Sequence, residues 1–243
     1  GLILASPLTV CIVVLGRYVP YLSFLDTLLG DRPALSLGQR FYQRLLADDV
    51  DEATGLIEQE LDDGERTLPQ VFDDLAIPAL VQARVDFRKG TMEADEQKEF
   101  IDNLKNVIEA EDKNFAAKTD EPHETAERKV VLAIPARDAT DELAVTMLGK
   151  SISNDHFDWH EMSSLGLATE TLAMIAQLKA NIIVITSVYP GNLAHTIYLC
   201  KRIRARFPEI TIVAGRLGMD DPDMMKNNSD KLLAVGAKIV IHT

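Results

Sequence analysis

Residues 181–188, with the sequence NIIVITSV, decide the fold class. The run is apolar over most of its length and rich in β-branched side chains, which is typical of a parallel strand covered on both faces. Comparable short runs alternate with helical patterns on either side of it: KVVLAIP at 129–135, FDWHEMS at 157–163, EITIVAG at 209–215 and KIVIHT at 238–243. We therefore predict an α/β, flavodoxin-like (Rossmann-like) five-stranded parallel sheet in the order 2-1-3-4-5.

The loops after the first, third and fourth predicted strands carry the candidate ligand-binding residues. Right-handed crossovers bring loops 135–142, 187–192 and 214–219 to the carboxyl edge of the sheet, where such folds bind ligands. The polar side chains expected around this crevice are Arg137, Asp138, Thr140, Ser187, Asn192 and Arg216. Two arginines would suit a small anionic ligand, such as a nucleotide or a phosphate ester.

A helical bundle is predicted before the sheet. Residues 36–112 carry apolar side chains at helical spacing, for example at i, i+4, i+7 and i+8 counted from Phe100, and read as about four helices. Pro78 should bend or break one of them. Residues 113–127 are polar and lack periodicity, which indicates a linker to a Rossmann-like domain at 128–243.

The first 16 residues, GLILASPLTVCIVVLG, contain no charged side chain. They are interpreted either as a buried core helix or as the end of a last membrane span. Arg17 and Arg32 follow the run, which would place the downstream side in the cytoplasm by the positive-inside rule. We favour the membrane interpretation, with residues 1–35 as the end of the span and a juxtamembrane connector.

Composition excludes some classes of function. A net charge of −13 argues against a nucleic-acid partner, because phosphate recognition needs a positive surface. The cysteines, Cys11 and Cys200, lie far apart and have no partner at metal-ligand spacing. His156, Asp158 and His160 would share one side of a strand and could hold zinc, but we favour an exposed edge strand and expect no metal site.

No catalytic constellation is evident either. Ser187 lacks a nucleophile elbow and recognisable acid and base partners, and the chain has no P-loop or G-x-G-x-x-G motif. His195 is interpreted as a surface or capping residue of a helix. We therefore expect a protein that is not an enzyme, although a flavodoxin-like or hydrolase-like enzyme stays open as a minor alternative.

A helical bundle joined to a five-stranded Rossmann-like domain resembles the cobalamin-binding module of methionine synthase, corrinoid proteins and light-sensing repressors. LPQVFDDLAIPALVQ at 68–82 and DFRKGTMEADEQ at 86–97 are similar to the cap bundle of that family. The family binds cobalt through a D-x-H-x-x-G loop after the first strand. Asp138 matches the acid of this loop, but Thr140 stands in place of the histidine and Leu143 in place of the glycine.

Other positions also depart from the family pattern. Ser187 matches the family's serine in the third strand, whereas its Gly-Gly pair becomes Gly215-Arg216, where a guanidinium would obstruct the channel for the nucleotide tail. Phe87 replaces the tryptophan of light-sensing members. The resemblance implies a cobalamin loop that has lost its cobalt ligand, and hence no cofactor. The alternative is a functional corrinoid-binding domain that binds cobalamin base-on without a protein histidine.

The N-terminal 35 residues resemble the final span and exit segment of the AI-2E (PerM-like) transporter family. The most specific part is ASPLTVCIVVLGRYVP at 5–20. This resemblance implies a multi-pass permease of the bacterial inner membrane with the present C-terminal domain in the cytoplasm, and we expect a homo-oligomer. The leading hypothesis is a non-enzymatic regulatory, ligand-sensing or assembly domain of such a permease.

Overall fold

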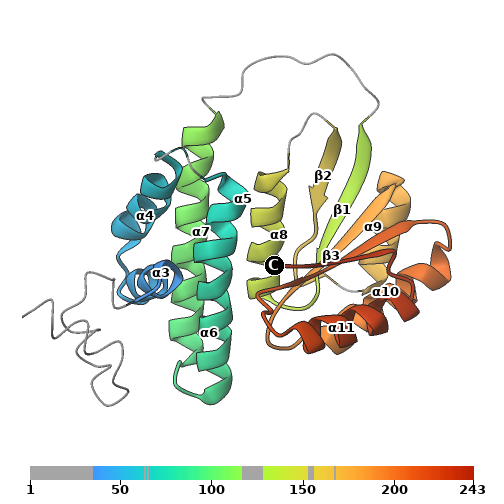
Figure 1. Ribbon diagram of the computed structural model, residues 1–243. Coiled ribbons are helices and arrows are strands. Elements are labelled where there is room, and N and C mark those ends of the chain that lie inside the picture. Colours follow the sequence, from blue (N-terminus) through green and yellow to red (C-terminus); the bar gives the residue numbers. More distant parts are fainter. Residues whose placement is uncertain (1–34, 63, 65, 117–127, 153–155, 167) are drawn as a thin grey trace, which may run out of the picture. The chain divides into compact units, whose positions relative to one another are not determined.

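The computed structural model of the 243-residue chain describes residues 35–62, 64, 66–116, 128–152, 156–166 and 168–243 (Figure 1). The chain divides into residues 1–36 and 37–243, and the fold described here is that of the second unit. The predicted membrane segment, residues 1–35, lies outside the described residues except for its last position. None of the described helices combines the length and the apolar character that a membrane span needs.

The sheet has five parallel strands in the order β2-β1-β3-β4-β5, which confirms the predicted fold class. The strands are β1 (Lys129–Pro135), β2 (Phe157–Glu161), β3 (Ile182–Val188), β4 (Thr211–Leu217) and β5 (Ile239–His242). The run that decided the fold class, 181–188, forms β3 at the centre of the sheet. Its side chains from Ile183 to Val188 are all buried, as expected for a strand covered on both faces.

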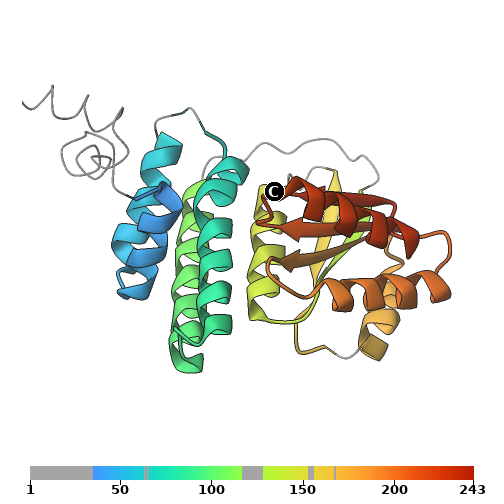
Figure 2. The same cartoon turned by 60° about the horizontal axis from the view of Figure 1, so that its bottom comes forward.

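Helices connect the strands and cover both faces of the sheet. They are α8 (Ala139–Ser151), α9 (Ala168–Leu178), α10 (Leu193–Arg206) and α11 (Pro222–Ala234). Helix α8 packs on β1 and β3, while α10 and α11 run side by side on the opposite face (Figures 1 and 2). The connection from β1 to β2 runs across the sheet in the opposite direction to the later connections. Because all crossovers are right-handed, α8 lies on one face of the sheet and the later helices lie on the other.

The region before the sheet is a helical bundle. Its elements are α3 (Leu37–Leu46), α4 (Val50–Asp62), α5 (Leu68–Val71), the π-helical turn η2 (Phe72–Ala76), α6 (Ile77–Lys89) and α7 (Ala94–Ala116). The π-helical turn ends two residues before Pro78, which cannot donate a backbone hydrogen bond, so the predicted bend or break takes the form of a π-helical turn. Helix α7 continues into the first residues of the predicted linker and ends at Ala116.

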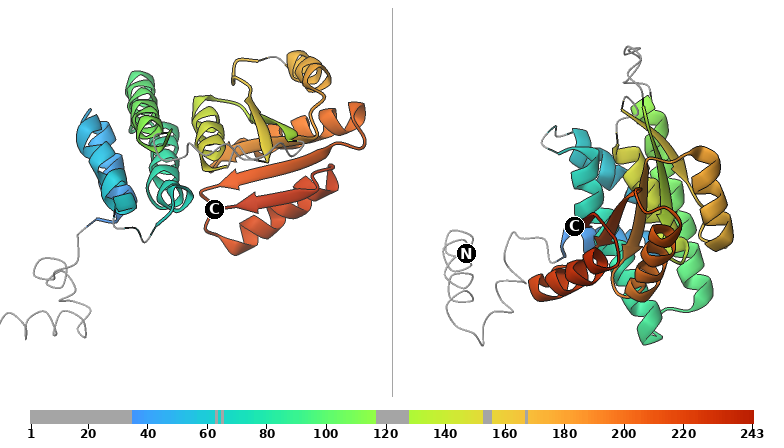
Figure 3. Two further views of the ribbon diagram at one scale, coloured as in Figure 1. Left: turned by 90° about the horizontal axis from the view of Figure 1, so that it is seen from above. Right: turned by 90° about the vertical axis from the view of Figure 1, so that its right-hand side faces the viewer.

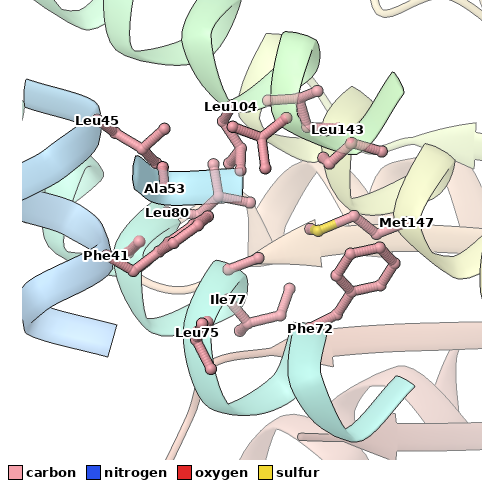
Figure 4. Close-up of a cluster of buried hydrophobic side chains, with 14 of the residues drawn as sticks. Phe41, Leu45, Ala53, Phe72, Leu75, Ile77, Leu80, Leu104, Leu143 and Met147 are labelled. Carbon is pink, nitrogen blue, oxygen red and sulfur yellow. The ribbon is translucent and has the colours of Figure 1, made fainter. Parts of the chain in front are cut away.

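A single hydrophobic core joins the bundle to the sheet domain. Helix α8 lies between the sheet and helix α7 (Figure 3). Leu143 and Met147 of α8 belong to the same buried cluster as Phe72, Leu80 and Leu104 of the bundle (Figure 4). The bundle therefore buries its apolar faces against the sheet domain as well as internally, and neither part has a separate core at this boundary.

Gly218, directly after β4, shows how closely the two parts approach. It adopts a positive φ of 72°, a conformation that favours glycine. A Cβ atom at this position would lie 2.2 Å from Cγ2 of Val81 and 3.1 Å from Cγ2 of Ile77, both in α6. Any larger residue here would push the bundle away from the sheet edge.

Candidate functional site: a crevice between the bundle and the sheet

The carboxyl edge of the sheet faces helix α6 and the start of α7. The first turn of α8 begins at Asp138, whose carboxylate caps the helix by accepting a hydrogen bond from the backbone N–H of Asp141. The first turn of α10 begins at Asn192, which holds a left-handed backbone conformation that asparagine tolerates. Both loops thus present a helix N-terminus to the crevice, and the Asp138 side chain caps its helix whereas the Asn192 side chain makes no capping hydrogen bond.

Arg84 of α6 crosses from the bundle into this edge. Its side chain is buried, with 5% of the residue exposed. The guanidinium forms an ion pair with Asp138 and another with Asp141, at 3.1 Å, and it donates to the backbone carbonyl of Val188 at 2.5 Å. Asn192 donates to both carboxylates, at 3.2 Å and 2.8 Å. We call Arg84, Asp138, Asp141 and Asn192 the Arg84 cluster.

Asp141 is the centre of the Arg84 cluster, and it is fully buried. Besides Arg84 and Asn192, its carboxylate accepts hydrogen bonds from the backbone N–H groups of Arg137, at 3.0 Å, and Val188, at 2.9 Å. Burial raises the pKa of Asp141 above its ordinary value, and the adjacent Arg84 guanidinium opposes that shift. All of these hydrogen bonds are donated to the Asp141 carboxylate. The surroundings therefore hold this carboxylate in place as an acceptor, and they are not those of a group that carries a proton.

Ser187 and Arg216 lie beneath the crevice. Arg216 is 2% exposed and donates to the Ser187 hydroxyl at 3.0 Å and to the Gly191 carbonyl at 2.6 Å. Its Nε is one of the buried side-chain atoms without a hydrogen-bond partner in the described part of the chain. Burial lowers the pKa of this guanidinium, with Asp141 opposing the shift. The Arg216 side chain therefore fills the space beside Ser187.

Above the Arg84 cluster lies an open pocket of about 490 Å³, which we call the crevice pocket. Its walls come from α6, the start of α7, and the loops after β1 and β3; the lining residues are Arg84, Phe87, Arg88, Gln97, Ile101, Arg137, Asp138, Ala139, Thr140, Pro190, Gly191 and Asn192. Arg88 and Arg137 are exposed. No ion pair or side-chain hydrogen bond joins either guanidinium to another described residue. We call these two the rim arginines.

The structure brings the predicted site residues to one edge but separates them into two layers. Arg137, Asp138, Thr140 and Asn192 line the crevice pocket, whereas Ser187 and Arg216 lie beneath it and bond to each other. The loops predicted at the carboxyl edge are confirmed, because β1, β3 and β4 end there.

Sequence reasoning missed Arg84 and Asp141. Arg84 lies in a mostly apolar stretch of α6, ALVQARV at 79–85, and an arginine within a buried face needs a partner. Asp141 lies three residues after a capping aspartate, where a second acid in the first helical turn would ordinarily be a solvent-exposed residue. Only the first of these two signals was available from the sequence.

Asp158 and His160 of the candidate zinc trio lie on β2, an edge strand of the sheet, and His156 directly precedes this strand. His160 and Asp158 form a pair at 3.1 Å between Nε2 and Oδ2; His160 is half-buried, whereas Asp158 and His156 are exposed. Within the described residues, no group of three or more histidine, cysteine or acidic side chains could hold a metal ion. His195 lies in the first turn of α10 and is exposed, with its ring 5.8 Å from that of Tyr198.

The residues of this crevice do not fit a cobalamin held as the resemblance implies. Thr140, in the position of the cobalt-binding histidine, is buried and offers a hydroxyl rather than an imidazole nitrogen. Asp138, which would orient that histidine, is bound by Arg84 and Asn192. The buried Arg216 side chain occupies the space beside Ser187 and Gly215, where the nucleotide tail would pass.

No protein-family model matches the sequence, and no curated protein is similar to it. Solved structures do resemble it. A crystal structure of a novel cobalamin-binding protein from Desulfitobacterium hafniense DCB-2 is 9% identical, covers 83% of this chain and 90% of that chain, and has a TM-score of 0.37. The methanol:cobalamin methyltransferase complex MtaBC from Methanosarcina barkeri is 13% identical, covers 85% of this chain and 74% of that chain, and has a TM-score of 0.36.

The GsuK RCK domain is 20% identical over 49% of this chain, with a TM-score of 0.35, and this chain spans 26% of its length. No family assignment follows from these likenesses.

Proposed function

We propose that this chain is the non-enzymatic regulatory end of a multi-pass permease of the bacterial inner membrane. In this proposal residues 1–35 complete the last span, and the helical bundle and sheet domain lie in the cytoplasm as a homo-oligomer. The support for membrane attachment is the uncharged N-terminal run and its resemblance to the exit segment of AI-2E transporters. Regulation would consist of a change at the crevice that alters the bundle, and through it the preceding segment.

The observation that carries the proposal is the Arg84 cluster. A buried guanidinium from the bundle is bound by two carboxylates and a carbonyl of the sheet domain. Such a group is stable only while both parts stay in register, because an unpaired buried charge costs several kcal/mol. A ligand or partner that acts on the crevice therefore acts on the position of α6 as well.

The order of the helices along the chain also supports coupling between the crevice and the N-terminal segment. Helix α3 begins at Leu37, directly after the N-terminal segment, and packs against η2, α6 and α7. Helix α6 carries Arg84, so a continuous series of packed helices runs from the crevice to the start of the described chain. Coupling between the crevice and the N-terminal segment needs an element that can adopt two arrangements. The equilibrium between those arrangements must be shifted by changes at either place.

Fractionation of cells tests the attachment. The full chain should sediment with membranes, resist washing with high salt and alkaline carbonate, and require detergent for extraction. Residues 36–243 alone should stay in the supernatant and give a cooperative unfolding transition. A full chain that is monodisperse without detergent would contradict the membrane part of the proposal.

Incubation with hydroxocobalamin and with adenosylcobalamin, followed by desalting and an absorbance spectrum, tests the corrinoid alternative. The proposal predicts a colourless protein, because Arg216 fills the space beside Ser187. Stoichiometric retention of a corrin band would contradict it and would make the domain a cobalamin sensor.

A further inference from the structure

The crevice pocket differs in charge from the rest of the chain. The protein carries a net charge of −13, yet the pocket is lined by Arg84, Arg88 and Arg137 and by a single carboxylate, that of Asp138. Asp138 is engaged by Arg84 and Asn192, which leaves the rim arginines without counter-charges among the described residues. An acidic protein that gathers unpaired guanidinium groups in one concavity presents a local site for an anion.

Backbone groups add to the positive electrostatic potential of the crevice pocket. Ala139 and Thr140, in the first turn of α8, and Gly191 and Asn192, at the start of α10, also line the pocket. The N-termini of these two helices, of 13 and 14 residues, therefore open toward the same space; Asp138 caps α8, whereas no side chain caps α10, whose positive end favours negative charge. Nη1 of Arg88 comes close to the second loop, because a Cβ at Gly191 would lie 3.4 Å from it.

One wall of the crevice pocket is apolar. Phe87 is 41% exposed, although it is a large aromatic residue, and Ile101 is half-buried beside it. An exposed aromatic ring beside guanidinium groups provides a stacking surface for a planar group next to a phosphate site. The volume of about 490 Å³ is within the range of small-molecule sites.

We propose that the crevice pocket binds a nucleoside phosphate, with its phosphate between the rim arginines and its base against Phe87. The ligand would be the effector in the regulatory role proposed above. Only the effect of binding rests on that proposed role; the binding itself does not. Because Asp138 and Arg84 line the same pocket, a phosphate near them would compete for the Arg84 guanidinium and loosen the Arg84 cluster.

Isothermal titration of the full chain in detergent tests the site. The titrants are AMP, GMP, CMP and UMP, with adenosine and inorganic phosphate as single-part probes. We expect one site per chain for at least one of the nucleotides. That nucleotide should bind about tenfold or more tightly than adenosine or phosphate alone, because both halves of the ligand find contacts.

Variants locate the site. Arg88→Gln and Arg137→Gln should each weaken the binding about tenfold, and Phe87→Ala about fivefold, while the urea midpoint stays unchanged. The matched control is Arg40→Gln, which removes an exposed arginine of α3 outside the pocket lining and should leave the affinity unchanged.

Three results would overturn the inference. They are no binding of any of the four nucleotides, equal binding of phosphate and nucleotide, and nucleotide binding that the rim variants do not change. If the chain is membrane-bound but binds no nucleotide, the nucleotide site is contradicted and the proposed regulatory role stands. If the chain binds nucleotide but needs no detergent, the permease proposal is contradicted and the nucleotide site stands.

Discussion

The crevice holds one buried arginine, Arg84, next to the two rim arginines, and the two kinds of arginine differ in their partners. Arg84 is buried and bound by two carboxylates and a carbonyl, whereas the rim arginines, Arg88 and Arg137, are exposed and have no partner among the described residues. Arg84 and Arg88 lie one helical turn apart on α6. The difference indicates that Arg84 holds the bundle to the sheet and that the rim arginines are available to a ligand.

The largest effect is expected for Arg84→Met. Removal of the guanidinium leaves the buried Asp141 carboxylate without its ion-pair partner, which should lower the free energy of unfolding by about 3–5 kcal/mol. Urea unfolding followed by far-UV circular dichroism measures the change. The double variant Arg84→Met, Asp141→Leu should regain part of the loss; equal losses in the single and double variants would show that the pair does not act as a unit.

Gly218→Ala tests the same boundary without a change of charge. The new methyl group would overlap Val81 and would also require a positive φ at a non-glycine residue. We expect a loss of about 2 kcal/mol in the free energy of unfolding. Gly55→Ala is the control, because a Cβ there meets nothing within 4 Å. A Gly218 variant as stable as this control would mean that the bundle can shift away from the sheet edge at no energetic cost.

Arg216→Met should have a smaller effect, within about 1 kcal/mol. Arg216 is as buried as Arg84, but its acceptors are a hydroxyl and a carbonyl, so its removal leaves no buried carboxylate unpaired. The free energy of unfolding from urea titration decides between the two cases. A loss as large as that for Arg84→Met would show that burial, rather than the carboxylate partner, makes the difference.

Removal of the rim arginines should scarcely change stability. Arg88→Gln and Arg137→Gln each alter an exposed side chain, and the free energy of unfolding should stay within about 0.5 kcal/mol of the parent. Thermal melts of both variants beside Arg40→Gln provide the measurement. A clear loss of stability would mean that these side chains hold the crevice together and are not free for a ligand.

The smallest effect concerns the pH dependence contributed by His242. Burial lowers the pKa of this imidazole in the folded protein below its ordinary value of 6.5; a hydrogen bond with the Arg216 backbone opposes this shift, and the nearby Arg216 charge adds to it. The unfolded chain then binds more protons between the two pKa values, so the His242 contribution is present above about pH 6.5 and is lost as the pH falls. In His242→Asn, the loss of unfolding free energy between pH 7.5 and pH 5.5 should be smaller than in the parent, and an equal loss in both would contradict the assignment.

Local sequence patterns were sufficient for the fold and for part of the site. The apolar run at 181–188 fixes a central parallel strand, and crossover handedness then places Asp138 and Asn192 at the same edge. The Arg84 cluster could not be predicted in this way. Arg84 and Asp138 are 54 residues apart, in helices whose relative position depends on the packing of the whole core.

The burial and the hydrogen-bond partners of each polar side chain could not be predicted from the sequence either. Ser187 and Arg216 occupy neighbouring strands in register, so their proximity could be predicted, but their mutual hydrogen bond required knowledge of what covers them. The contrast between Arg84 and the rim arginines arises from the same cause. Burial and partners are properties of the assembled core, while the sequence records only the residue types.

The most direct test of the coupling between bundle and sheet is urea unfolding followed at two places in the same protein. Trp159 on β2, the single tryptophan of the 243 residues, reports on the sheet by fluorescence. Hydrogen exchange of the buried amides around Leu104 in α7 reports on the bundle. We predict one transition with the same midpoint for both probes. Two separate transitions in the parent protein would contradict it, because the bundle and the sheet would then unfold as independent domains.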